Sequence, residues 1–109
     1  MDDQTFKIKL KEIIEAFSSE DFELAIKKAE DFQKELQNQD EKIFVKNIIK
    51  IITAANLVNQ QKLEESLQIL ESCYLELKNY SPTYKGLKVE NLLQSVNQSI
   101  ADIKAIIKK

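Results

Sequence analysis

The 109-residue chain contains one glycine, Gly86, and one proline, Pro82. A multi-stranded sheet needs turn signals about every 8 to 12 positions, and glycine and proline are the strongest of these signals. Both residues lie in one short stretch, so the chain has too little turn chemistry for such a sheet. The sequence therefore predicts an all-α fold, and a chain of this length is expected to form a single domain.

Apolar residues recur at spacings of three and four along the chain, which is the period of an amphipathic helix. We expect five helices, at about residues 4–17, 19–37, 41–59, 63–79 and 88–107. The third helix is apolar around much of its circumference, so it is expected at the centre of the fold. Its apolar run is interrupted by polar residues and is too short to span a membrane.

The stretch FSSEDFELAIKKAEDF, residues 17–32, carries signals that start a helix. Ser18 and Asp21 form a variant of the capping box, in which a side-chain oxygen accepts a hydrogen bond from a free backbone amide. Phe17 and Phe22 have the spacing of a hydrophobic staple. These signals predict a sharp reversal between the first two helices.

Residues 20–36 align with residues 61–77 after a shift of 41 positions. The identical pairs in this alignment are Glu23 with Glu64, Glu30 with Glu71, Glu35 with Glu76, and Leu36 with Leu77. The internal repeat predicts two stacked antiparallel helical hairpins, with the C-terminal helix as a cap over the exposed end.

The segments DFELAIKKAE and KLEESLQILE resemble the second helix of a tetratricopeptide repeat. In that helix a large residue is followed by a small one that lets the paired helix approach, as Phe22 with Ala25 and Leu63 with Ser66 do here. The resemblance covers about residues 6–79 and implies stacked helical hairpins. The repeat length of 41 exceeds the usual length of about 34, the aromatic signature of the first helix is missing, and no proline closes either unit.

A second resemblance spans most of the chain. The order of FSSEDFELAIKKAEDF, IIKIITAANLVNQQKLEESLQILESCYLEL and YKGLKVENLL is similar to a family of small bacterial helical proteins of unknown function. That family carries a Phe-Glu-Ala-His-Glu type motif on an early helix. The histidine is missing here, where Ala25 or Ile26 stands in the corresponding region. Neither resemblance implies a reaction.

All 16 cationic side chains are lysines, and histidine is absent. The chain therefore lacks the usual near-neutral general base and the imidazole metal ligand. Acid pairs at helical spacing, Glu12 with Glu15 and Asp31 with Glu35, could share a proton or hold a metal, but such pairs are ordinary on a solvated helix. Cys73 falls at a predicted core position and has no histidine base. We expect no enzyme activity, no cofactor and no metal, and a carboxylate-based enzyme is the third hypothesis.

Four residues are candidates for contact with a partner protein. Leu24 and Val45 lie off the main apolar stripes of their helices, as Ile8 does, and together they could form a second apolar surface. Tyr80 and Tyr84 flank a turn, and tyrosine is favoured at interfaces. The alternative is that these tyrosines cover the edge of the core.

Lys42, Lys46 and Lys50 recur every four residues and could contact phosphates on one helical face. Residues 18–41 carry eight acids and three lysines, a balance of −5, while residues 42–62 carry four lysines and no acid, a balance of +4. The alternative is therefore that the second and third helices attract each other. The acidic isoelectric point of about 5.2 and the absence of arginine disfavour nucleic-acid binding.

The leading hypothesis is a non-enzymatic protein-protein interaction module, such as an adaptor, a chaperone-like protein or an assembly subunit. Its expected binding site is an apolar helical groove flanked by the acidic second helix and the tyrosine loop, and its partner is another protein or a second copy of itself. The alternative is a small helical subunit of a nucleoprotein assembly. The N-terminal sequence MDDQTFKIKL lacks a secretory pattern and the lone cysteine cannot form an internal disulfide, so a cytoplasmic location is expected.

Overall fold

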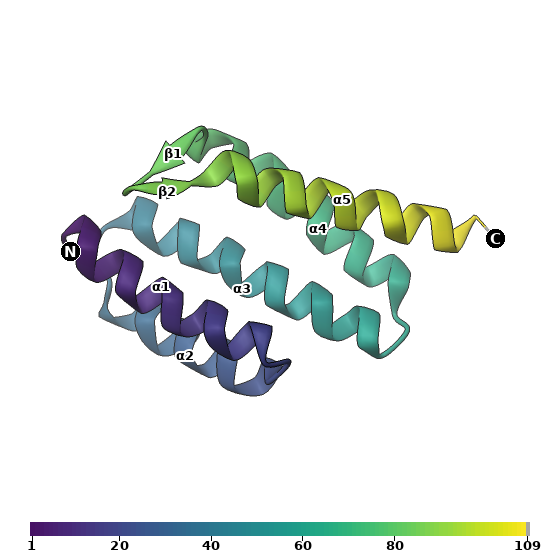
Figure 1. The fold of residues 1–109 in the computed structure, drawn as a ribbon, viewed down its shortest axis with the longest axis horizontal. Helices are drawn as coiled ribbons and strands as arrows, with labels where there is room; N and C mark the ends of the chain where they lie inside the picture. The colour runs from purple at the N-terminus through teal and green to yellow at the C-terminus, as the bar shows by residue number, and fades with distance from the viewer. Residues whose placement is uncertain (109) are drawn as a thin grey trace.

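In a computed structural model, which describes residues 1–108, the chain forms five α-helices in sequence (Figure 1). These helices are α1 (Asp3–Ser18), α2 (Phe22–Glu35), α3 (Gln39–Asn59), α4 (Leu63–Leu77) and α5 (Val89–Ile107). The all-α prediction is confirmed. None of the helices in residues 1–108 combines the length and the apolar character that crossing a membrane requires.

Each helix packs against the next one along the chain, so α3 lies between α2 and α4. The pairs α1–α2 and α3–α4 form the two predicted hairpins, and α5 lies against α4 as the predicted cap. Helices α1, α3 and α5 run in the same direction, with their N-terminal ends at the same end of the molecule (Figure 1). Because α1 and α5 stand at opposite sides of the stack, one face of α3 is left between them.

The turns within the two hairpins have the same backbone hydrogen bonds. In the first turn the amide of Asp21 donates to the carbonyl of Ala16 at 3.1 Å, and in the second the amide of Lys62 donates to the carbonyl of Leu57 at 2.9 Å. Both donors and both acceptors are 41 positions apart in the sequence. The repeat predicted from the side-chain pattern is therefore present in the backbone.

The start of α2 differs from the prediction. Asp21, and not Ser18, caps this helix, and its carboxylate accepts a hydrogen bond from the amide of Leu24 at 3.2 Å. Ser18 is the last residue of α1, and the reversal occupies the three residues between α1 and α2. The staple is as predicted, since the rings of Phe17 and Phe22 lie 5.8 Å apart.

The connection before α5 contains structure that the sequence pattern did not indicate. After the short 3-10 turn η1 (Lys78–Tyr80), strands β1 (Thr83–Tyr84) and β2 (Leu87–Lys88) pair in an antiparallel hairpin. Lys85 and Gly86 form its two-residue turn with φ values of 51° and 79°. Two positive φ values are what a tight turn between twisted strands requires.

The buried side chains form two clusters. The larger one is centred on the first three helices, around Phe6, Leu10 and Phe44, and also includes residues of α4 and the first residue of α5. The smaller one joins the C-terminal half of α3 to α4 and α5, around Ala54, Leu70 and Val96. The two clusters lie along the axis of α3, which confirms its central place.

Candidate functional site

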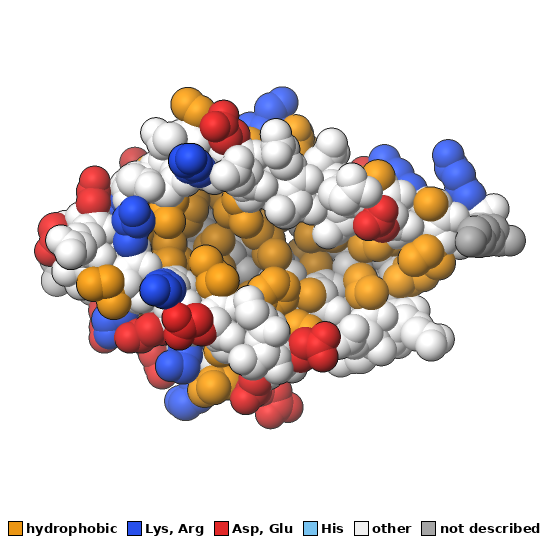
Figure 2. Space-filling model, in the orientation of Figure 1, with side chains coloured by type: hydrophobic (Ala, Val, Ile, Leu, Met, Phe, Trp, Pro, Cys, Tyr) orange, Lys and Arg blue, Asp and Glu red, His pale blue; other side chains and the backbone are white. Residues whose placement is uncertain are grey.

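An apolar groove runs along the molecule between α1 and α5, with α3 as its floor. Figure 2 shows hydrophobic side chains gathered in a hollow between two ridges, in the same view as Figure 1. The groove has a volume of about 550 Å³. The wall on α1 consists of Leu10, Ile13, Ile14 and Phe17, and the floor includes Ile48, Ile51, Ile52, Ala55 and Val58. The apolar residues of the α5 wall are Val89, Leu92, Val96, Ile103 and Ile106.

The side chains that face the groove from α5 and α3 are partly short ones. Ser95 and Ser99 are four positions apart and line the groove from one helical face of α5. Ala55 lines the floor between larger residues. Short side chains at these positions leave a hollow between α1 and α5, since α1 packs against α2 and α5 packs against α4.

Two large apolar side chains of the groove are exposed to solvent. Ile14 on α1 is 49% exposed and Ile106 on α5 is 52% exposed, and both line the groove. Exposed apolar side chains are common singly, but a continuous apolar surface of this kind is typical of a binding site. The groove is therefore the candidate functional site.

The groove has few charged groups, and they lie at opposite ends. Lys88 lines it beside the β-hairpin, and Asp102 lines it toward the C-terminal end of α5. A shallower hollow on α1 shares Leu10, Ile14 and Leu87 with the groove and extends it past the hairpin. Lys7 and Lys11 line this extension.

None of the four predicted partner-binding residues lines the groove. Leu24 is 41% exposed on α2, as expected for a residue off the apolar stripe, but α2 contributes no lining residue to the groove. The expectation of surface exposure for Val45 is wrong, since this residue is fully buried. Its helix is covered by α2 on one side and α4 on the other, so a position off the main stripe still faces protein.

Tyr80 and Tyr84 are half-buried in an aromatic cluster. The ring of Tyr84 lies 4.9 Å from Phe44 and 6.0 Å from Phe6, and the hydroxyl of Tyr80 donates to the carbonyl of Asp40 at 3.2 Å. Burial raises the pKa of both tyrosines. These contacts match the alternative that the tyrosines cover the core edge, where they attach the hairpin to α1 and α3.

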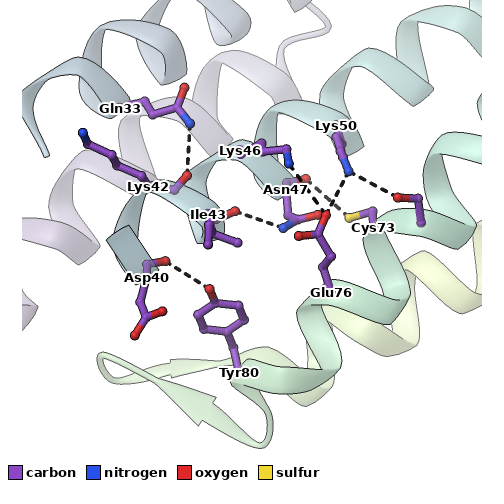
Figure 3. A network of polar contacts seen from close by, with 11 residues as sticks. Gln33, Asp40, Lys42, Ile43, Lys46, Asn47, Lys50, Cys73, Glu76 and Tyr80 are labelled. Carbon is purple, nitrogen blue, oxygen red and sulfur yellow. Dashed lines mark hydrogen bonds and ion pairs between the residues drawn. The ribbon is translucent and has the colours of Figure 1, made fainter. Parts of the chain in front are cut away.

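The lysine stripe of α3 contacts α4. Lys46 and Lys50 point toward Glu76 (Figure 3), with Nζ to Oε1 distances of 4.0 Å and 3.0 Å. Hydrogen bonding from Lys50 lowers the pKa of Glu76. Among residues 1–108 no ion pair joins acidic α2 to α3, and Lys42 contacts α2 through its carbonyl, which accepts from Gln33 at 3.0 Å. The ion pairs of the stripe within residues 1–108 are therefore made with α4 and not with α2.

Cys73 lies in the core between α3 and α4, as the sequence predicted. Its thiol donates to the carbonyl of Asn47 at 3.4 Å, and burial raises its pKa to about 12. The thiol is thus protonated at neutral pH, which is the opposite of what a nucleophile requires.

Of the two acid pairs considered from the sequence, Asp31 and Glu35 each make an ordinary surface contact with a lysine. Asp31 lies 3.7 Å from the ammonium of Lys27, and Glu35 lies 4.0 Å from that of Lys9. Within residues 1–108 there is no group of three or more acidic, cysteine or histidine side chains arranged to hold a metal ion.

The groove residues Ile14, Ser99 and Ile106 were not identified from the sequence as a site. Ile14 belongs to the apolar stripe of its helix, and nothing in that stripe distinguishes a core position from a groove position. On α5 the available signal was that Ser95 and Ser99, two short residues, are four positions apart on one helical face.

Comparisons of the chain with protein-family models, with curated proteins and with solved structures found no match. The fold and the groove define an all-α domain of stacked helical hairpins with an open apolar groove on one face. The two family resemblances stay predictions.

Proposed function

We propose that the protein is an interaction module that binds an amphipathic helix of a partner protein in the groove between α1 and α5. The observation that carries this proposal is the open, continuous apolar lining contributed by α1, α3 and α5. Helix-in-groove binding is a common mode of peptide recognition, in which side chains at positions i, i+3 or i+4, and i+7 anchor the helix.

The shape of the groove favours a helix as the occupant. It lies alongside α5, whose 19 residues extend about 28 Å. Its walls are helices, and the gaps between the side chains of one helix accept the side chains of another. This is how helices pack together. A partner helix that lies in the groove would contact α1, α3 and α5 at once.

Other occupants fit less well. Small ligands are usually bound in hollows that enclose most of their surface, whereas this groove is open to solvent along its length (Figure 2). A partner strand would need a free sheet edge, and the strands within residues 1–108 are two residues long. The lysines of the nucleic-acid hypothesis are in part engaged by Glu76.

The test is capture of a partner from extract of the source cells, after nuclease treatment, by the tagged protein and three variants. Ile14→Glu and Ile106→Glu place a charge in the groove at exposed positions. Leu24→Glu is the matched control, because Leu24 is an exposed apolar residue outside the groove.

We expect one partner to be retained by the unmodified protein and by Leu24→Glu, and to be lost with both groove variants. The segment of this partner that crosslinks to the groove, made as a peptide, should gain helical circular dichroism on binding. Retention by both groove variants contradicts the proposal. Retention only when nuclease is omitted assigns the protein to nucleic acid and makes Lys42, Lys46 and Lys50 the residues to study.

A further inference from the structure

The second inference concerns the direction of the bound helix, and it rests on the proposed function of the groove. Helices α1, α3 and α5 all begin at the hairpin end of the molecule and run toward its other end (Figure 1). A helix carries about half a positive charge at its N-terminus and about half a negative charge at its C-terminus. Three of the helices that line the groove therefore have parallel dipoles, whereas α4, which lines it through Ser66 and Leu70, runs the other way (Figure 1). The majority direction favours an antiparallel occupant.

The charged side chains of the groove have the same polarity as these dipoles. Lys88 lies at the hairpin end, where the extension of the groove adds Lys7 and Lys11. In residues 1–108, no carboxylate lies within 4.0 Å of the ammonium groups of these three lysines.

The remaining charged side chains near the groove do not change this pattern. Asp3 also lines the extension, but its carboxylate lies 3.5 Å from the ammonium of Lys85. At the far end Asp102 lines the groove, whereas Lys104 on the same helix lies 3.6 Å from Glu71 of α4. The groove thus presents cations at one end and an anion at the other.

We propose that the occupant is an amphipathic helix that lies antiparallel to α5 and carries acidic residues in or just after its last turn. Its acidic end lies among Lys7, Lys11 and Lys88, and its N-terminal end lies near Asp102. Both the helix dipoles and the side-chain charges favour this direction over the reverse one. Acidic residues at a C-terminus weaken an isolated helix, so the free segment is expected to become helical mainly on binding.

The test uses two fluorescent peptides of about 16 residues, long enough to fill most of the groove. Both carry the same leucine stripe at helical spacing. One has three glutamates in its last turn, and the other has the same three glutamates in its first turn. Binding of each to the full chain is measured by fluorescence anisotropy at low and high salt.

We expect the peptide with C-terminal acids to bind about tenfold more tightly, since several surface ion pairs together supply this difference. The preference should disappear in high salt and in a variant with Lys7→Gln, Lys11→Gln and Lys88→Gln. A variant with Lys27→Gln, Lys28→Gln and Lys34→Gln on α2 removes the same charge away from the groove and should keep the preference.

The possible failures are distinguishable. Equal binding of both peptides, abolished by Ile14→Glu, keeps the proposed function and overturns the inferred direction. Tighter binding of the peptide with N-terminal acids also overturns the direction. Binding of neither peptide at high concentration overturns both proposals.

Two further results would assign the groove to another occupant and overturn the inference. One is a dimer in solution that dissociates with Ile14→Glu, which would place a second copy of this chain in the groove. The other is displacement of a bound apolar dye by a twelve-carbon fatty acid but by neither peptide.

Discussion

Glu20 and Gln61, 41 positions apart in the sequence, adopt the same left-handed backbone conformation, with φ values of 62° and 63°. Each residue lies in the turn that joins the two helices of a hairpin. Its amide donates to a carbonyl three positions earlier, Phe17 in the first turn and Val58 in the second, both at 2.9 Å. The two turns are therefore equivalent in backbone geometry although their residues differ.

We expect Glu20→Gly and Gln61→Gly each to raise the free energy of unfolding by about 0.5 kcal/mol. A side chain in the left-handed region costs about 1 to 2 kcal/mol, and the greater freedom of glycine in the unfolded chain offsets part of the gain. Urea unfolding measures the change, and the two effects should add in the double variant. Ser19→Gly is the control, because Ser19 has a φ of −81° and should lose stability as glycine. A loss of stability in both test variants would contradict the argument.

The helices of this fold follow from local pattern, because apolar spacing depends only on neighbouring residues. The repeat predicted the two hairpins because each copy of it is itself a local pattern of apolar residues on either side of a turn. Local pattern failed at Val45, whose burial depends on which helices cover α3 from two sides. It also failed at the start of α2, where Ser18 and Asp21 are both good caps and the geometry of the reversal selects Asp21.

The groove depends on a distance between helices that are far apart in the sequence. Ile14 and Ile106 have ordinary places in apolar stripes, and each would be buried if α1 and α5 were in contact. What leaves them exposed is the sequential packing of the five helices, in which α1 pairs with α2 and α5 pairs with α4. The sequence predicted an apolar groove but placed it beside acidic α2, which contributes none of its lining.

Glu76→Gln should lower stability at neutral pH by about 0.5 kcal/mol, the usual size for an ion pair at a protein surface. Hydrogen bonding from Lys50 lowers the pKa of Glu76 below the value in the unfolded chain, so the contribution is present above about pH 4.3 and is lost as pH falls through the folded-state value. Thermal unfolding between about pH 7 and pH 2 measures this difference. Glu30→Gln on α2, where no ion pair to Glu30 is present within residues 1–108, should show a smaller difference at every pH. A Glu76 effect that is constant with pH would be inconsistent with the ion pair.

Cys73 should react with thiol reagents only when the protein unfolds. Burial raises its pKa to about 12, so at pH 8 about one thiol in ten thousand is ionised. We expect the labelling rate to rise with urea in parallel with the unfolded fraction. Ser72→Cys in a Cys73→Ala background places a thiol on the exposed face of α4 and should be labelled at once without urea. Fast labelling of the native, unmodified protein would show that the α3–α4 contact opens locally.

The ion pair between Lys85 and Glu41 attaches the β-hairpin to the start of α3. The ammonium of Lys85 lies 2.7 Å from Oε2 of Glu41, whose side chain is 3% exposed, and it donates to the carbonyl of Met1 at 3.1 Å. Hydrogen bonding to Glu41 raises the pKa of Lys85. The stabilisation is therefore present below the ordinary lysine pKa of about 10.4 and is lost as pH rises through the folded-state value.

Lys85→Met should lower the free energy of unfolding at pH 7 by about 2 kcal/mol, because the buried Glu41 carboxylate loses its closest cation and keeps the ammonium of Met1 at 4.0 Å. Adding Glu41→Gln should recover much of this loss, since the second change removes the buried charge. Urea unfolding of the two single variants and the double variant gives the coupling between the residues. Lys88→Met, in the same hairpin but without an ion pair in residues 1–108, should change stability by less than about 0.5 kcal/mol. Additive losses in the double variant would mean that the hairpin is held by its aromatic contacts and not by this ion pair.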